Sequence, residues 1–154
     1  MRLTSFTDYG LRALMRLAGE PDKTFTTDEI ASEFSISRNH LTKVVRNLAR
    51  TGFVATQRGA GGGFSLARPP ESITLGDVVR ALEQRHAIVE CFREDGGNCL
   101  LTPRCRLKGR FAAAREAFLR ELDRTTLAEC AYPGRREPIQ SAGRRSDGAH
   151  HIDC

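Results

Sequence analysis

Apolar side chains near the start of the chain recur every three or four positions, which is the spacing of an amphipathic helix. Within residues 5–18 these positions are Leu11, Leu14 and Met15. We predict a helix over this range, with Ser5 and Asp8 at the spacing of a capping box. A second, shorter helix is predicted over residues 26–34, where Thr26 and Glu29 have the same spacing.

A third helical pattern is followed by two short runs of β-forming residues. The helix is predicted in SRNHLTKVVRNLART, where Ser37 is the expected N-cap and Gly52 ends the helix. The two runs, FVATQ and GFSLA, are separated by RGAGGG, which predicts a hairpin with a glycine-rich tip. Three helices followed by a hairpin are typical of a winged helix-turn-helix. We therefore predict a mainly α fold, with a DNA-binding domain of this type over residues 1–70.

The second half of the chain predicts two more helices and a tail. Residues 74–84 form one amphipathic pattern, and from Leu107 to about Ala128 apolar residues step by threes and fours, close to a heptad. Because a single helix cannot bury its apolar stripe on itself, we predict that the longer one pairs with a second chain, with packing on its own domain as the alternative. We assign residues 71–130 to a cysteine-bearing loop and this dimerisation helix. We expect a disordered tail over residues 131–154.

The distribution of charge indicates the kind of partner. The formal net charge is +5, and residues 35–68 carry six Arg or Lys side chains and no Asp or Glu. A segment that excludes anions over this length favours a polyanionic partner such as nucleic acid. No apolar run resembles a signal peptide or approaches the roughly 18 residues of a membrane span. We therefore expect a cytoplasmic protein with reduced thiols and no membrane partner.

The predicted third helix has one apolar side and one side of hydrogen-bonding and cationic groups. Its apolar positions are Leu41, Val44, Val45 and Leu48. A recognition helix needs this division, because one side packs on its own domain while the other enters the major groove of double-stranded DNA. The residues expected to meet base edges are Ser37, Arg38, Asn39, His40 and Lys43. Arg46 and Arg50 are expected to contact phosphates, and Arg58 at the hairpin tip a phosphate or the minor groove.

Three of the five cysteines lie close together, with the spacing C-x7-C-x5-C. They are Cys91, Cys99 and Cys105. Structural zinc sites normally use close CxxC pairs and a fourth Cys or His, and this segment has neither. Iron–sulfur clusters accept wider spacing and bind thiolates, and the basic residues around Cys105 would offset the charge of a cluster. The alternatives are a disulfide with a spare thiol, a metal-free redox switch, a zinc-bound dimer and three unconnected thiols.

No constellation of acid, base and nucleophile accompanies the cysteines, so the sequence does not indicate an enzyme. His40 lies on the predicted DNA-binding helix, His86 is isolated, and His150 and His151 lie in the tail. An iron–sulfur protein that transfers electrons is the remaining rival class.

Several long motifs resemble, in order, one family. They are LTSFTDYGLRAL, SRNHLTKVVRNLARTGFV, RGAGGGFSLARP and TPRCRLKGRFAAAREAFLRELDRTTLAE. Together they are similar to the nitric-oxide-sensing repressors of the bacterial Rrf2 family, over roughly residues 1–130. The resemblance implies a homodimeric winged helix-turn-helix repressor in which Cys91, Cys99 and Cys105 hold an iron–sulfur cluster. It also implies that Asp8 of the partner subunit is the fourth ligand, although a helix cap would explain Asp8 equally well.

The resemblance further implies the cofactor and the signal. We expect a four-iron, four-sulfur cluster, with a two-iron form possible, and expect nitric oxide to attack it and release DNA. The iron–sulfur-assembly regulator of the same family has a histidine ligand three residues after its last cysteine, where this chain has Lys108. The x7 gap is shared with iron-responsive regulators of the family, so iron or redox status remains the alternative signal.

Overall fold

Five α-helices and a two-stranded hairpin make up most of the structure. The computed structural model describes residues 3–84, 87, 89–93, 95–101 and 104–134. The helices are α1 (Ser5–Gly19), α2 (Thr27–Glu33), α3 (Arg38–Arg50), α4 (Leu75–Leu82) and α5 (Arg106–Leu122). The strands are β1 (Val54–Gln57) and β2 (Gly63–Leu66), and the short 3-10 helices are η1 (Pro70–Ser72), η2 (Glu90–Phe92) and η4 (Ala128–Cys130). This order confirms the predicted winged helix-turn-helix.

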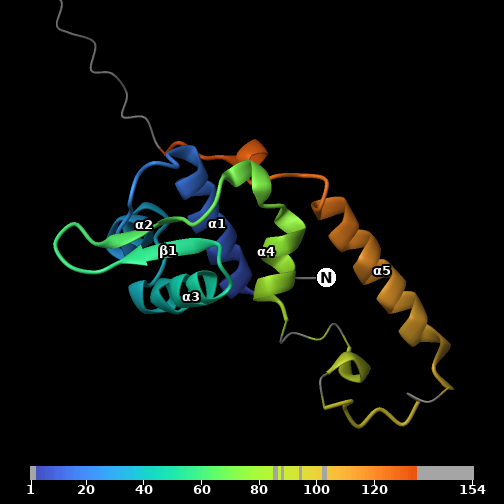
Figure 1. The fold of residues 1–154 in the computed structure, drawn as a ribbon. Coiled ribbons are helices and arrows are strands. Elements are labelled where there is room, and N and C mark those ends of the chain that lie inside the picture. The colour runs from blue at the N-terminus through green and yellow to red at the C-terminus, as the bar shows by residue number, and fades with distance from the viewer. Residues whose placement is uncertain (1–2, 85–86, 88, 94, 102–103, 135–154) are drawn as a thin grey trace, which may run out of the picture.

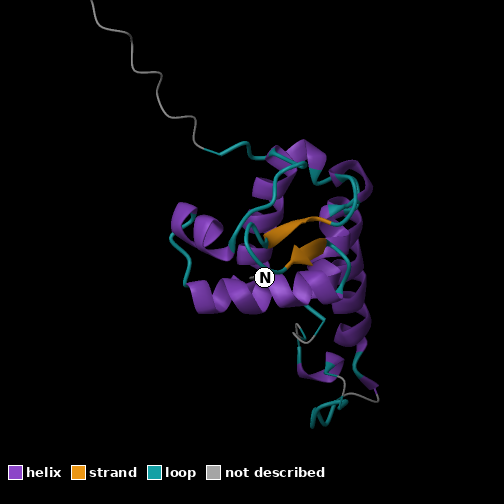
Figure 2. Ribbon diagram, turned by 60° about the vertical axis from the view of Figure 1, so that its left-hand side comes forward, coloured by secondary structure: helices purple, strands orange, loops and turns teal. Residues whose placement is uncertain are grey.

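The helices from α1 to α4 and the hairpin lie together, whereas α5 extends away from them (Figure 1). We call residues 3–84 the head and the segment 85–105, between α4 and α5, the cysteine loop. In both ribbon views the described part of the cysteine loop lies beyond the end of α4, outside the head (Figures 1 and 2). The two strands lie against the helices of the head (Figure 2).

Threonine side chains begin three of the four helices of the head. The predicted capping box of Thr26 and Glu29 is present at α2, and Thr74 with Asp77 forms a second one at α4. The prediction of Ser5 as the cap of α1 was wrong by one residue. Thr4 is the N-cap, and its hydroxyl accepts the Thr7 N–H at 3.2 Å. Ser37 occupies the predicted N-cap of α3, but its side chain makes no capping hydrogen bond.

The hairpin is fixed to the head by a short bridge to the segment before α2. Phe25 and Phe64 exchange two backbone hydrogen bonds of 2.9 and 2.8 Å, and both side chains are buried. A side chain at Gly63 would overlap the carbonyl of Phe25, so glycine permits this close approach. The bridge holds the base of the wing on the core.

Three helices of the head meet at Gly10. A Cβ atom built on Gly10 would lie 2.5 Å from Cδ1 of Leu82 on α4 and 3.5 Å from Cγ1 of Val44 on α3. Gly10, Val44 and Leu82 are all buried. The backbone of α1 therefore approaches both neighbours at one point, and a displacement of α4 would act on α1 and α3 together.

The helix α5 is shorter than the predicted one. It ends at Leu122 rather than near residue 128, because Asp123 is held by Arg80 of α4 through two hydrogen bonds of 2.6 Å. The hydrogen bonds from Arg80 lower the pKa of the Asp123 carboxyl. Leu119 is the only buried residue of α5. The apolar stripe predicted for dimerisation is thus largely uncovered by this chain.

The prediction of disorder from residue 131 was wrong for its first residues, and residues 135–154 lie outside the described part. The backbone N–H of Tyr132 donates to Met15 of α1 at 2.8 Å, and its ring lies 5.9 Å from that of Phe34. A side chain at Gly19 would overlap the carbonyl of Tyr132. These contacts hold the chain after α5 against α1 and α2.

Gly10→Ala and Gly109→Ala form a matched pair that tests the junction of α1, α3 and α4. Gly10→Ala should lower the free energy of unfolding by about 1–3 kcal/mol, since the new methyl group has to displace packed side chains. Gly109 lies in α5 with no atom within 4 Å of a built Cβ, so Gly109→Ala should raise the free energy by about 0.5–1 kcal/mol. Urea denaturation measures both. Equal stability of Gly10→Ala and the parent would contradict the close packing.

Candidate nucleic-acid interface and cysteine loop

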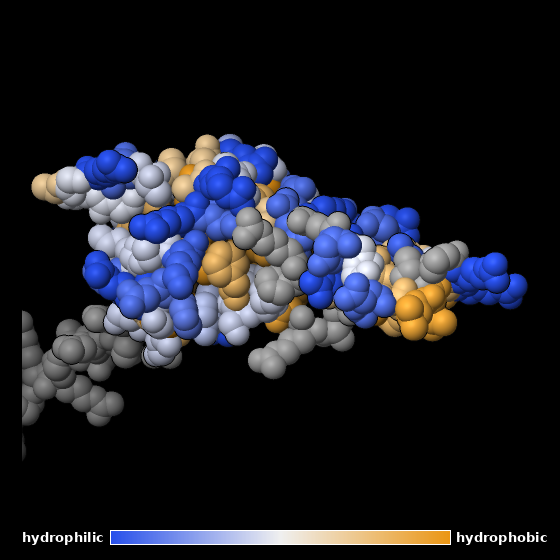
Figure 3. Space-filling view, turned by 90° about the horizontal axis from the view of Figure 1, so that it is seen from below, coloured by the Kyte–Doolittle hydropathy of each residue, from blue (hydrophilic) through white to orange (hydrophobic). Residues whose placement is uncertain are grey.

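The outward face of α3 carries the side chains predicted to bind DNA. Leu41, Val44, Val45 and Leu48 are buried against the head, as predicted. The predicted DNA-binding side chains are all exposed: Ser37, Arg38, Asn39, His40, Lys43, Arg46, Arg50 and, beyond β1, Arg58. Seen from below, hydrophilic side chains gather over the side of the head that carries α3, with an apolar patch among them (Figure 3).

Most cations of this face are free to meet a ligand. Arg38 is paired with Asp28 of α2 at 2.5 Å, with both side chains about two thirds exposed. Such an exposed pair contributes little and can exchange for a phosphate or base. Within the described chain, Lys43, Arg46 and Arg50 form no ion pair with an acidic side chain. Their charge is therefore available to a polyanion.

A buried arginine fixes α2, and hence the turn before α3, on α1. Arg16 is 7% exposed; its Nε atom donates to Glu33 of α2 at 2.9 Å and its Nη2 atom pairs with Glu20 at 2.7 Å. Its guanidinium also lies 4.5 Å from the ring centre of Phe25. Burial lowers the pKa of Arg16, but the hydrogen bonds to Glu20 and Glu33 outweigh burial and raise it.

The end of α4 holds the beginning of α1 through one carboxylate. Oε1 of Glu83 accepts hydrogen bonds from the backbone N–H and the hydroxyl of Thr4, both at 2.8 Å. It also accepts one from the hydroxyl of Thr7 at 2.5 Å, and Thr7 is fully buried. Glu83 directly follows α4 and stands two residues before the cysteine loop begins. Glu83 thereby connects the segment that leads into the loop with the beginning of α1.

The three predicted cysteine ligands lie on different parts of the cysteine loop. Cys91 belongs to η2, Cys99 lies in a stretch without regular secondary structure, and Cys105 is the N-cap residue of α5; all three are half-buried. The backbone N–H of Asn98 donates to the Glu90 carboxylate at 3.0 Å, so the residues before Cys91 and before Cys99 are held together.

The loop is further shaped by a turn at Asp95. The Asp95 carboxylate accepts the Gly97 N–H at 3.0 Å, which lowers the pKa of this carboxyl, and Arg93 pairs with it at 2.8 Å. Gly97 has a φ of +59°, and a side chain there would overlap the carbonyl of Glu90.

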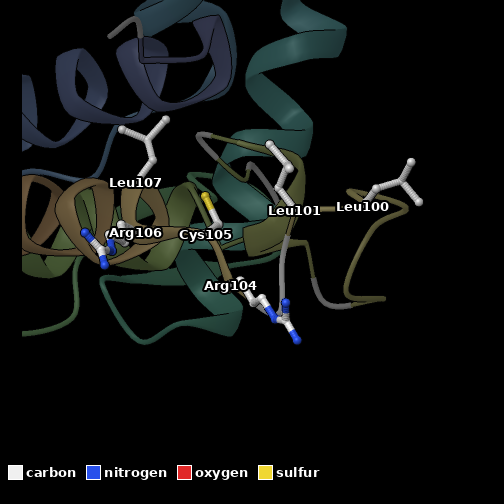
Figure 4. Close-up of a pocket in the computed structure, with 6 residues that line it drawn as sticks. All are labelled: Leu100, Leu101, Arg104, Cys105, Arg106 and Leu107. Atoms are coloured by element: carbon white, nitrogen blue, oxygen red, sulfur yellow. The ribbon is translucent and has the colours of Figure 1, made fainter.

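Cys105 lines an apolar hollow of about 630 Å³. Its sulfur points to the same side as Leu101 and Leu107, while Arg104 points to the opposite side (Figure 4). Leu101 and Leu107 are 69% and 58% exposed, and Leu100, also in the lining, is 96% exposed. Apolar side chains this exposed and this close together indicate a surface that another molecule covers.

The predicted metal ligands are not gathered in the single chain. Within the described residues no group of three or more His, Cys, Asp or Glu side chains is placed to hold a metal ion. Asp8 lies on α1, where its carboxylate is about half exposed and pairs with Arg12 at 2.8 Å. Because Thr4 provides the cap of α1, a capping role does not explain Asp8.

Sequence reasoning missed several residues that connect the elements. Glu83 and Thr7 were not predicted to interact, since a hydrogen bond between residues 76 positions apart leaves no local signal. The same holds for the pair of Arg80 and Asp123. Within the described part of the chain no helix is both long and apolar enough to span a bilayer.

Comparison with known protein families shows the family to which this chain belongs. A family model described as "Rrf2: Iron-dependent Transcriptional regulator" matches residues 3–132. The chain belongs to the Rrf2 family. It is similar to a protein of Geobacillus kaustophilus (strain HTA426) named "HTH-type transcriptional regulator NsrR", with 47% identity over 131 residues. The match covers 84% of this chain and 88% of that protein.

Solved structures agree with this assignment. The structure titled as CymR (YrzC), the global cysteine regulator of B. subtilis, has 31% identity and a TM-score of 0.65, covering 85% of this chain and 96% of that one. The structure titled T. potens IscR has 25% identity and a TM-score of 0.66, covering 84% and 85%. The chain is therefore an Rrf2-family transcriptional regulator of winged-helix fold, and its relatives are DNA-binding regulators rather than enzymes.

Asn39→Ala and Arg46→Ala should separate base recognition from phosphate binding on α3. Arg46→Ala should weaken binding to all DNA sequences and reduce the salt dependence of the affinity by about one phosphate contact. Asn39→Ala should cost about 1–3 kcal/mol on the preferred sequence and much less on others. Fluorescence anisotropy over a range of salt concentrations measures both. Arg124→Ala, which removes an exposed cation beyond α5, is the control and should bind as the parent does.

Proposed function

We propose that this regulator is a homodimeric, cytoplasmic repressor that binds promoter DNA through α3 and the wing and responds to nitric oxide through an iron–sulfur cluster on the cysteine loop. The observation that carries the proposal is the position of this loop. It begins two residues after Glu83, whose carboxylate holds Thr4 and Thr7 at the start of α1. A change in the loop is thus placed to act directly on the DNA-binding head.

The donor set supports a cluster. Three half-buried thiols on one loop are the soft ligands that iron–sulfur clusters use. Cys91, Cys99 and Cys105 would hold the cluster, with four irons preferred and two possible. When bound, it would supply iron with which nitric oxide combines. The match of the chain to the "Iron-dependent" family model is consistent with this cofactor.

The uncovered apolar surface supports a homodimer. Apart from Leu119, the residues of α5 are exposed or only half-buried, and Leu100, Leu101 and Leu107 are exposed at its start. A second copy would cover this surface. It would also bring a second Asp8 carboxylate, half exposed on α1, to complete the ligand set that one chain leaves incomplete.

The required spacing between the two recognition helices of a dimer would make DNA binding respond strongly to a small change in the cysteine loop. The two copies of α3 must lie about one turn of DNA apart to occupy both halves of a palindromic site. Specific binding typically exceeds nonspecific binding by roughly 4–10 kcal/mol. A nearly complete change of state needs a difference of about 5.5 kcal/mol. Loss of register at both half-sites, passed from Glu83 through α1 to α3, would remove free energy of this order.

Cys99→Ala tests the cysteine loop as the sensor. The variant should lose iron and inorganic sulfide and lose regulated DNA binding, while the head keeps its fold because Cys99 lies outside the core. Iron and sulfide analysis, DNA binding and circular dichroism of oxygen-free protein measure this. Cys130→Ala is the matched control, since Cys130 is also half-buried but lies in η4, and it should keep both properties. Tight, nitric-oxide-sensitive binding by Cys99→Ala would refute the proposal.

Asp8→Ala tests the bridge between subunits. The visible absorption spectrum of the oxygen-free protein should change and the cluster should become more labile, because one ligand is replaced. Arg12→Ala removes the ion-pair partner of Asp8 but leaves its carboxylate, so its spectrum should match that of the parent. Identical spectra and identical nitric oxide responses for Asp8→Ala and the parent would remove Asp8 from the ligand set.

A further inference from the structure

A groove of about 570 Å³ runs between α3 and the last turn of α4. One wall carries Lys43, Arg46 and Arg50 of α3, and the other carries Ala81, Leu82 and Gln84 at the end of α4. The groove opens beside the outward face of α3, so it borders the surface proposed to meet DNA. Gln84, on the α4 wall, lies outside the helix predicted to bind DNA.

Among the described residues the lining is cationic and contains no acidic side chain. None of Lys43, Arg46 and Arg50 forms an ion pair with a carboxylate in the described part of the chain. Three unneutralised cations on one wall repel one another, and an anion between them removes that repulsion. The opposite wall is partly apolar, with Ala81 and Leu82, which lowers the local dielectric constant and strengthens attraction to an anion.

A buried polar atom in the same groove also lacks a partner. Oδ1 of Asn47, which lines the groove, is buried and accepts no hydrogen bond from the part of the chain that the structure describes. Buried polar atoms without partners are rare in folded proteins and call for an explanation. The oxygen and nitrogen of an Asn amide exchange places by a half-turn of the group, and only the turned amide, with its N–H donors at this end, is compatible with a neighbouring anion.

We propose that this groove binds a phosphate of the DNA backbone next to the half-site that α3 enters. The proposal rests on the proposed binding of DNA and adds a contact from α4, which the recognition helix alone would not predict. The groove is continuous with the cationic face of α3, so a duplex lying along that face brings its backbone to the opening. Arg46 and Arg50 then contact the phosphate from one side, and Gln84 donates from the other.

The position of Gln84 in the sequence also links the phosphate contact to the cysteine loop. Gln84 follows Glu83, which is hydrogen-bonded to Thr4 and Thr7, and precedes the cysteine loop by one residue. The α4 wall of the groove is therefore formed by the same turn that carries the connection from the loop to α1. A change in the loop alters the phosphate contact directly, without passing through the core.

Opposite charges at Gln84 test the groove. Full-length, oxygen-free protein first selects a duplex of about 30 base pairs from a random pool, and anisotropy then gives the affinity of each variant over a range of salt. Gln84→Lys should bind roughly three- to tenfold more tightly at low salt, with a salt slope steeper by about 0.9 for each groove occupied. Gln84→Glu should bind more weakly by a similar factor. Gln84→Ala should bind more weakly than the parent by a smaller factor than Gln84→Glu, because it loses only the hydrogen bond that Gln84 donates to the phosphate. A merely structural role of Gln84 would not reverse the sign of the effect with the charge.

Further measurements identify the anion that the groove binds. They also distinguish failure of the groove proposal from failure of the proposed function. Neutral methylphosphonates placed next to the half-site should abolish the difference between Gln84→Lys and Gln84→Glu. Inorganic phosphate that binds the parent and not Gln84→Glu, yet lowers the affinity for DNA no more than chloride does at equal ionic strength, would instead assign the groove to a free anion and overturn the proposal. If the parent binds its selected duplex and all three Gln84 variants bind it with the same affinity, the proposed phosphate contact in the groove is wrong and the proposed DNA binding stands. If the parent selects and binds no duplex, the proposed function is wrong together with the proposed groove contact.

Discussion

The close approach of α1 to α3 and α4 at Gly10 is the constraint on which the rest of the structure depends. The missing side chain at Gly10 lets Val44 of the recognition helix and Leu82 of α4 pack on the same point of α1. The carboxylate of Glu83, next to Leu82, then holds the hydroxyls of Thr4 and Thr7. The beginning of α1 and the end of α4 are therefore held together, and the cysteine loop follows directly after this end of α4.

Other contacts set the orientation of the DNA-binding elements around these two helices. Arg16 connects α1 to Glu33 of α2, and the backbone bridge between Phe25 and Phe64 holds the wing. These interactions are internal to the head and do not involve the cysteine loop. The head can thus keep its fold when the loop changes, which is the property that a regulator needs if it is to release DNA without unfolding.

The sequence predicted the elements whose signals are local. The hairpin, the capping box at Thr26 and the apolar side of α3 all follow from spacing within one turn or strand. The end of α5 could not be predicted, because the periodicity continues past Leu122 while the contact that stops the helix, Arg80 with Asp123, is tertiary. The cysteines were identifiable from their spacing. That no metal site forms among the described residues of one chain, and that a groove lies beside α3, depend on how distant segments pack.

The central claim is that the cysteine loop controls the grip of α3 on DNA. Its most direct test is the affinity of one oxygen-free preparation of the dimer for its selected duplex, measured before and after addition of nitric oxide, alongside the iron and sulfide content of that preparation. The account predicts stoichiometric iron and sulfide, and a fall in affinity toward the nonspecific level, typically roughly 10³-fold or more. Protein that contains neither element, or that binds the duplex equally tightly with and without the gas, would contradict it.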